Sequence, residues 1–257
     1  MQVLSFEQQL TSPALCTMLK RSLQALLLCL PFASACAAEG ELRMIAPLNH
    51  VMPLARFHDH QLSGGILKDL GDAIARRLGR RAVYVSVAVD QVGPALTHGK
   101  ADGLCYVRPF WIDGAFDWSR PVIPDAELVA STLDAPVIAS LLDLRDRPVG
   151  TVAGYRYPRV EQVLGLRFQR RDSATMEESL NAMTAGSTRH TVLNRATLLY
   201  QQKHNKSLKL RADLVLASFS AQCAFSKRGK VAFGDVDRAI NTLIDDGSVE
   251  AILARYR

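Results

Sequence analysis

The sequence predicts an α/β fold of two lobes that are joined by two crossing strands. Two β-α-β-α-β patterns of similar plan follow each other along the chain, the first within residues 41–107 and the second within residues 149–218. An extended run at 127–132 lies between them, and a further strand at 222–226 follows the second. Because β-α-β crossovers are right-handed and join parallel strands, each lobe is expected to hold a mostly parallel sheet flanked by helices.

The first pattern alternates between β-branched or apolar runs and segments of helical periodicity. Ile66, Leu70, Ile74 and Leu78 recur at helical spacing, and Gly79 stands where a helix would stop. The elements predicted here are a strand at 41–46, a polar, turn-rich segment at 57–65, a helix at 65–78, a strand at 82–89, a helix at 91–98 and a strand at 103–107.

The second pattern follows a helical turn at 141–147. Pro158 fits the first turn of a helix, and Asp172 or Ser173 is the predicted N-cap of a later one. The predicted strands are 149–152, 168–171, 190–194, one or two within 208–218, and 222–226; the predicted helices are 158–164, 173–185, 195–203, 231–246 and 248–257. We therefore assign residues 39–124 and 222–257 to the first lobe and residues 125–221 to the second.

Residues 1–38 are predicted to be a secretory signal peptide and not part of the fold. Its basic segment contains Lys20 and Arg21, its apolar segment is residues 22–32, and small residues surround Cys36. Translation is predicted to start at Met18, and lipid attachment at Cys36 is the alternative to simple cleavage. No later apolar run approaches the roughly 18 residues that a membrane span needs. The protein is therefore expected in the periplasm.

The charge of the chain gives no support for a nucleic-acid partner. The formal net charge is +6, of which Lys20, Arg21 and Glu7 in the signal peptide contribute one unit. The remaining charges are scattered, without a run of five or more of one sign, whereas nucleic-acid-binding proteins concentrate basic residues.

Cys105 and Cys223 are the two cysteines that follow the signal peptide. In an oxidising compartment a pair of cysteines indicates one disulfide bond. The alternative is two buried thiols on neighbouring strands.

The candidate site begins where the strand at 103–107 ends. Arg108, Phe110 and Trp111 follow this strand directly. In open α/β sheets ligands bind beyond the carboxyl ends of the strands, so residues in this position are candidates for ligand binding. The alternative is a tryptophan-rich core segment with an incidental surface arginine.

Five segments of the chain, taken in order, carry a resemblance to a known family. They are G-I-L-K-D-L-G-D-A-I-A-R-R-L-G, H-G-K-A-D-G, D-W-S-R-P, L-L-D-L-R-D-R-P-V-G-T-V-A-G-Y and R-A-I-N-T-L-I-D-D-G-S-V-E-A-I-L-A-R-Y. Together they resemble the family 3 extracytoplasmic solute-binding proteins, the polar amino-acid type that serves ABC transporters. The resemblance covers residues 39–257 and implies the two-lobe, type II periplasmic-binding-protein fold.

Two positions depart from the pattern of that family. Members that bind free amino acids usually carry an arginine for the α-carboxylate where this chain has Ile112. They often carry an acid for the α-ammonium where this chain has Asn194. An amide supplies no compensating charge, and a buried, unpaired ammonium costs several kcal/mol. A standard zwitterionic amino acid is therefore not the expected ligand.

The predicted function is capture of a small polar, carboxylate-bearing molecule between the lobes, for delivery to an ABC transporter. Arg108 would hold the carboxylate, and Asn194 would add a neutral hydrogen bond. Aromatic rings would stack on the rest of the ligand, and a glycine-led loop of the second lobe would offer backbone N–H groups to an anion. The predicted ligand-binding residues are Tyr106, Arg108, Phe110, Trp111, Gly154, Tyr155, Arg156, Tyr157 and Asn194.

Two other functions stay open at this point. The protein could sense a solute for a membrane receptor, or it could be a dehydratase or lyase that uses one of the nearby acids Asp113, Asp117 and Glu127. No acid is paired with a histidine at a recognisable spacing, so no catalytic residue or cofactor is predicted. His50, His58 and His60 are predicted to lie in solvated loops, so no metal is expected. We expect a monomer that contacts a permease or receptor transiently.

Overall fold

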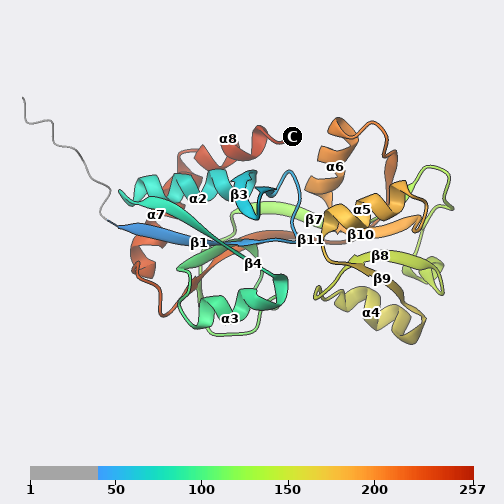
Figure 1. Ribbon diagram of the computed structural model, residues 1–257, viewed down its shortest axis with the longest axis horizontal. Coiled ribbons are helices and arrows are strands. Elements are labelled where there is room, and N and C mark those ends of the chain that lie inside the picture. The colour runs from blue at the N-terminus through green and yellow to red at the C-terminus, as the bar shows by residue number, and fades with distance from the viewer. Residues whose placement is uncertain (1–39) are drawn as a thin grey trace, which may run out of the picture. The chain divides into compact units, whose positions relative to one another are not determined.

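A computed structural model describes residues 40–257 of the chain (Figure 1). The predicted signal peptide, its start at Met18 and the alternative lipid attachment at Cys36 lie outside the described residues. Within residues 40–257, no helix combines the length and the apolar character that crossing a membrane requires.

The first lobe is built on three parallel strands. β1 (Glu41–Pro47) lies between β4 (Arg81–Val87) and β5 (Gly103–Val107). Helix α2 (Ile66–Arg77) buries its apolar stripe against the sheet, and α3 (Val92–Thr97) follows a 3-10 turn at Val89–Gln91. The segment predicted as a polar, turn-rich loop instead forms a hairpin, β2 (Arg56–His58) with β3 (Gln61–Gly64). Strands of three or four residues are too short to be identified from the alternation of apolar and polar residues.

The second lobe repeats the parallel plan. β8 (Pro148–Val152) lies between β9 (Gln169–Ser173) and β10 (His190–Asn194). A 3-10 turn (Leu141–Leu144) precedes β8, and the helices are α4 (Pro158–Leu164), α5 (Met176–Thr184) and α6 (Arg195–His204). The last two helices, α7 (Phe233–Asp245) and α8 (Ser248–Ala254), return to the first lobe, where they pack beside α2 (Figure 1).

The predicted N-cap of α5 is wrong. Ser173 and Asp172 belong to β9, where Ser173 pairs with Val152 and the Asp172 carboxylate accepts a hydrogen bond from Thr151. The helix is capped by Thr175, whose side chain accepts a hydrogen bond from the Glu178 N–H. Pairing with β8 therefore moves the start of the helix toward the C-terminus.

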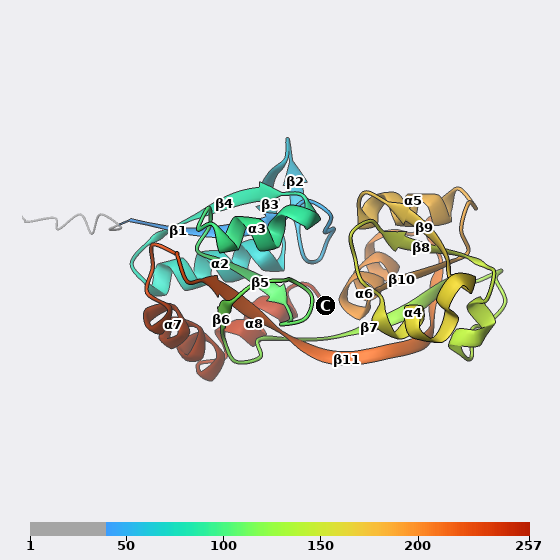
Figure 2. The same ribbon diagram turned by 90° about the horizontal axis from the view of Figure 1, so that it is seen from below.

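Two long antiparallel strands connect the lobes and confirm the predicted crossing strands. β7 (Ile123–Thr132) pairs with β11 (Leu210–Ser226), and the whole sheet has the order β4-β1-β5-β11-β7-β10-β8-β9, with β6 (Phe116–Trp118) also paired to β11. Figure 2 shows β7 and β11 running side by side between the two halves. β11 is one strand of 17 residues where the sequence indicated separate strands. It contains neither glycine nor proline to interrupt it. The predicted lobe boundaries at 124/125 and 221/222 stay a prediction.

Cys105 and Cys223 form the predicted disulfide bond. The two residues lie opposite each other in the antiparallel pairing of β5 with β11, with their Cα atoms 3.9 Å apart, and both are buried. The bond therefore fixes one connecting strand to the sheet of the first lobe.

Reducing this disulfide is expected to destabilise the protein. The bond closes a loop of 118 residues, and in the chain-entropy model such a loop adds roughly 4–5 kcal/mol to the free energy of unfolding. Urea unfolding of the oxidised protein with and without reductant measures the loss. Finding two free thiols in denatured, unreduced protein would show that the bond does not form.

Candidate functional site

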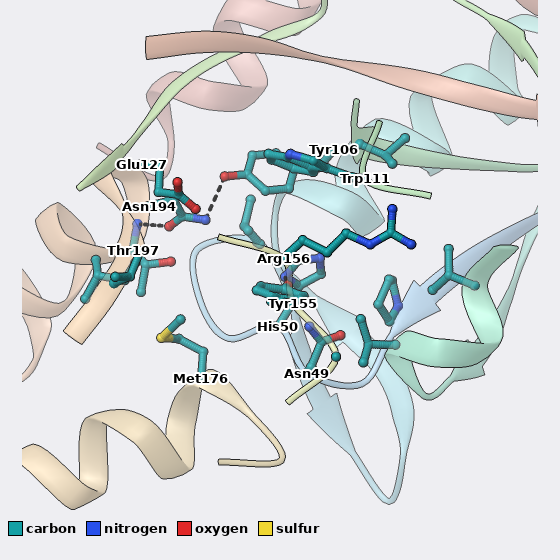
Figure 3. Close-up of a pocket in the computed structure, with 18 of the residues that line it drawn as sticks. Asn49, His50, Tyr106, Trp111, Glu127, Tyr155, Arg156, Met176, Asn194 and Thr197 are labelled. Atoms are coloured by element: carbon teal, nitrogen blue, oxygen red, sulfur yellow. Dashed lines mark hydrogen bonds between the residues drawn. The ribbon is translucent and has the colours of Figure 1, made fainter. Parts of the chain in front are cut away.

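A pocket of about 150 Å³ lies between the two lobes. Its walls come from the loop after β1, from the end of β5 and the loop that follows it, from the loop after β8, from the starts of α5 and α6, and from both connecting strands (Figure 3). The polar or aromatic residues that line it are Asn49, His50, Tyr106, Trp111, Glu127, Tyr155, Arg156, Tyr157, Asn194, Thr197 and Phe219. Most of the remaining wall is aliphatic.

The structure brings seven of the nine predicted residues into the pocket wall: Tyr106, Trp111, Gly154, Tyr155, Arg156, Tyr157 and Asn194. Arg108 and Phe110 are not part of the wall. The Arg108 guanidinium stacks on the Phe110 ring at 4.3 Å and lies 5.3 Å from the centre of the Phe219 ring. Such cation–π contacts hold the guanidinium beside the aromatic wall, and Phe110 itself is 54% exposed.

Tyr106 joins the two lobes through its buried hydroxyl. The hydroxyl donates to Asp125 Oδ2 at 2.8 Å and accepts from Asn194 Nδ2 at 2.7 Å. Burial, and then the negative charge of Asp125, raise the pKa of Tyr106 well above its usual value, so it stays a phenol. Its backbone has a φ of 62°, in the left-handed region that a bulky residue adopts only when its surroundings hold it there.

Asp125 and Asn194 use their other side-chain atoms to cap α6. Asp125 Oδ1 accepts from the N–H groups of Ala126 and Ala196, and Asn194 Oδ1 accepts from the Thr197 N–H at 2.9 Å. Burial raises the pKa of Asp125, and the hydrogen bonds from the Tyr106 hydroxyl and from the N–H groups of Ala126 and Ala196 oppose that shift. The polar atoms of Asn194 that the sequence assigned to a ligand are therefore engaged within the protein.

Glu127 lines the pocket, although the sequence indicated it only as a nearby acid. It lies two residues after Asp125 in β7 and opposite Asn194 in β10, and Figure 3 shows its carboxylate beside the Asn194 amide. Among residues 40–257 the carboxylate has no hydrogen-bond or ion-pair partner. Burial raises its pKa to about 7, which the Arg108 guanidinium opposes. Side chains alternate between the two faces of a strand, so Asp125 and Glu127 lie on one face. This alternation was the signal in the sequence that could have identified Glu127.

The prediction of a solvated loop was wrong for His50. Its ring lies edge-on to the Tyr106 ring at 5.8 Å, and its Nδ1 atom is 3.4 Å from the Tyr155 hydroxyl. Burial lowers the pKa of His50 to about 4, so the imidazole is neutral at pH 7. His58 and His60 are exposed, and no group of three or more potential metal ligands is found within the described part of the chain.

Asn49 connects the loop after β1 to the second lobe. Its backbone carbonyl accepts a hydrogen bond from the Met176 N–H, the first of α5, at 3.1 Å. Its side chain is 3% exposed, and neither amide atom has a partner among the described residues. A buried amide without partners is a candidate for hydrogen bonding to a ligand.

The glycine-led loop 154–157 closes the pocket from the second lobe. Gly154 has a φ of 79°, and a Cβ there would lie 2.7 Å from Val89 Cγ1 of the first lobe, so a larger residue would clash. The backbone N–H groups of Tyr155 and Tyr157 already donate to Val152 O and Glu161 Oε1. Arg156 forms an exposed two-bond ion pair with Asp113 of the first lobe. Two of the backbone donors of this loop, and its arginine side chain, are thus occupied.

No family model matches the chain, and no curated protein matches its sequence. Solved structures do match its fold. An ancestral arginine-binding protein bound to glutamine matches with a TM-score of 0.73 and 20% identity, over 84% of this chain and 97% of its own. The amino-acid ABC transporter substrate-binding protein AbpA from Streptococcus pneumoniae, bound to L-arginine, matches with a TM-score of 0.70 and 20% identity, over 87% and 97%.

A third match adds an enzyme precursor to these binding proteins. The ancestral amino acid-binding protein AncCDT-1, a precursor of cyclohexadienyl dehydratase, matches with a TM-score of 0.70 and 19% identity, over 84% of this chain and 95% of its own. These likenesses confirm the predicted type II periplasmic-binding-protein fold.

Replacing Glu127 with glutamine is expected to stabilise the unliganded protein above pH 7. The folded-state pKa of about 7 exceeds the ordinary value of 4.5, so the folded state favours the protonated acid. Stability that the wild type has near pH 4 is therefore lost as the pH rises through 7, by roughly 1–3 kcal/mol. Glu127→Gln lacks this loss, and urea unfolding between pH 4 and pH 8 measures it.

The exposed Glu177 of α5 gives the matched control, since Glu177→Gln makes the same chemical change on the surface. Parallel pH profiles for the wild type and Glu127→Gln would contradict the assignment.

Proposed function

We propose that this chain is a periplasmic solute-binding protein that captures a small organic molecule between its lobes and presents it to an ABC permease. The observation that carries the proposal is the pocket itself, whose walls include residues of both lobes and of both connecting strands (Figure 3). A ligand in such a position contacts both lobes at once, so its binding free energy favours the arrangement in which they approach each other. The fold likeness to amino-acid-binding proteins supports this function.

Hinge closure about β7 and β11 is the motion that we propose to accompany binding. Polar contacts join the lobes around the pocket. They are the ion pair of Arg156 with Asp113 and three hydrogen bonds: the Met176 N–H with the carbonyl of Asn49, Asn194 with the Tyr106 hydroxyl, and His50 Nδ1 with the Tyr155 hydroxyl. We propose residues 39–124 with 222–257, and residues 125–221, as the two moving lobes of a monomer. A membrane receptor that reads the same closure remains the alternative partner.

The partner that the sequence suggested for a ligand carboxylate does not line the pocket. The carboxylate expected from the sequence was to be bound by Arg108, which stacks on Phe110 outside the pocket wall. Arg156 is the arginine in the wall, and it pairs with Asp113. The matched binding proteins hold glutamine or arginine, which are amino acids with polar side chains.

An enzyme of the lyase or dehydratase type is the second candidate function. One observation favours it: a carboxyl group with a pKa of about 7 in a pocket can donate or accept a proton near neutral pH. The likeness to a precursor of cyclohexadienyl dehydratase points in the same direction. Glu127 would be the acid or base in that case.

Mass spectrometry of small molecules released from natively purified protein tests the proposed function. We expect a co-purified solute that is chemically intact and that raises the melting temperature when it is added back, because a ligand at about 100 times its Kd adds about 2.7 kcal/mol to stability. Conversion of the solute on incubation would favour the enzyme. The proposal fails if no solute is recovered and if amines, carboxylates and amino acids all leave the melting temperature unchanged.

Removing the exposed ion pair between the lobes is expected to weaken binding slightly. Exposed pairs contribute about 0.2–1 kcal/mol, so Asp113→Asn should raise the Kd for the recovered solute by up to about five-fold. Calorimetry measures the change. Asp134→Asn is the control, because it removes an exposed pair with Arg189 that lies within the second lobe. Equal effects of the two variants would show that the Arg156 pair does not act on closure.

A further inference from the structure

We propose that the pocket selects a small primary amine that has no carboxylate, and that Glu127 holds its ammonium group. The inference rests on the proposed function, since it names the ligand class of the same pocket. Three features of the described residues lead to it: one carboxylate without a partner, aromatic walls around it, and cationic side chains that are engaged elsewhere.

Glu127 is the acidic residue in the pocket wall, and its carboxylate has no hydrogen-bond or ion-pair partner within residues 40–257. The neighbouring Asn194 amide donates one N–H to the Tyr106 hydroxyl and forms no hydrogen bond with this carboxylate. Buried charges in proteins are ordinarily paired, and a positively charged ligand would supply the partner that this carboxylate lacks. A ligand ammonium would donate its hydrogen bonds to the two carboxylate oxygens.

The aromatic side chains of the wall suit the same ligand. The rings of Tyr106 and Trp111 lie 6.2 Å apart, Phe219 packs edge-on against both, and Tyr155 lies across the pocket from them in Figure 3. The faces of such rings attract cations, and their carbon surface also accommodates the apolar body of an amine.

The side chains that could bind a carboxylate are committed elsewhere. Arg156 pairs with Asp113, and Arg108 stacks on Phe110 outside the wall. His50 is uncharged at pH 7, because burial keeps its pKa near 4. An anion within the pocket would therefore have no free cationic side chain beside it.

Several backbone donors around the pocket are committed as well. The first N–H of α5 donates to the carbonyl of Asn49, and the Thr197 N–H of α6 donates to Asn194 Oδ1. In the loop after β8, the N–H groups of Tyr155 and Tyr157 have partners within the second lobe. The Asn49 amide is without a partner, so a ligand carboxylate would find a neutral donor there but no positive charge, whereas an ammonium would find the carboxylate of Glu127.

The positive charge of Arg108 acts on Glu127 from outside the pocket wall. Its charge lowers the attraction that a cation feels in the pocket, but the same charge favours the ionised form of Glu127. The side chain is held against three aromatic rings and not against the carboxylate. The local partner for the ligand's charge is therefore still Glu127.

Matched sets of ligands with the same body test the inference. Phenethylamine, phenylalanine and hydrocinnamate form one set, and isoamylamine, leucine and isocaproate form another. Binding is measured by calorimetry and thermal shift on the wild type, on Glu127→Gln and on the surface control Glu177→Gln. Glu127→Gln keeps the shape of the side chain and removes its charge, and its cooperative unfolding is checked first.

The amine of at least one set is expected to bind the wild type and Glu177→Gln about 100-fold more tightly than its amino acid or acid, and Glu127→Gln is expected to lose that binding by a similar factor. Equal amine affinity in Glu127→Gln, or tighter binding of an amino acid or acid, overturns the inference while leaving solute capture intact. Absence of binding by every member of both sets also overturns it; the solute recovered from native protein then decides the proposed function separately.

Discussion

One buried hydroxyl, that of Tyr106, connects the parts of the molecule on which the site depends. It links β5 of the first lobe to Asp125 on a connecting strand and to Asn194 at the end of β10. Each of these groups is at least partly buried, so the loss of one partner would leave the others unsatisfied at a cost of about 1–3 kcal/mol each. The network therefore fixes both the aromatic wall and the start of α6 relative to the connecting strand.

This network also decides which side chains remain for a ligand. Asn194 and Asp125 stand beside the pocket, yet their polar atoms serve the cap of α6 and the tyrosine. Glu127 lies on the same face of β7 as Asp125 but receives no such partner. Two acids two residues apart thus take different roles, one structural and one facing the pocket. The difference comes from the position of Tyr106 and not from the acids themselves.

The fold was predictable from the sequence because its signals are local. Apolar periodicity and turn residues identified nearly every strand and helix, and the rule that sites follow the carboxyl ends of strands pointed to Tyr106, Trp111 and the loop at 154–157. Glu127 and His50 were missed because their surroundings depend on residues far away in the chain. The register of β7 against β10 and the contact of His50 with Tyr155 join positions separated by tens of residues. The direction of the Arg108 side chain likewise depends on Phe219, in a strand near the end of the chain.

The path of β11 through both lobes sets an order for folding. The second lobe consists of one continuous stretch of chain, from β7 to the first part of β11, so it can assemble as soon as that stretch is available. β5 is the outermost of the three parallel strands of the first lobe, and its next neighbour in the sheet is β11. Cys223 of β11 follows Cys105 of β5 by 118 residues. Until that partner arrives, β5 has an unpaired edge and Cys105 an unpaired thiol, and such edges invite pairing with other chains. The first lobe begins the chain and is the last to be completed.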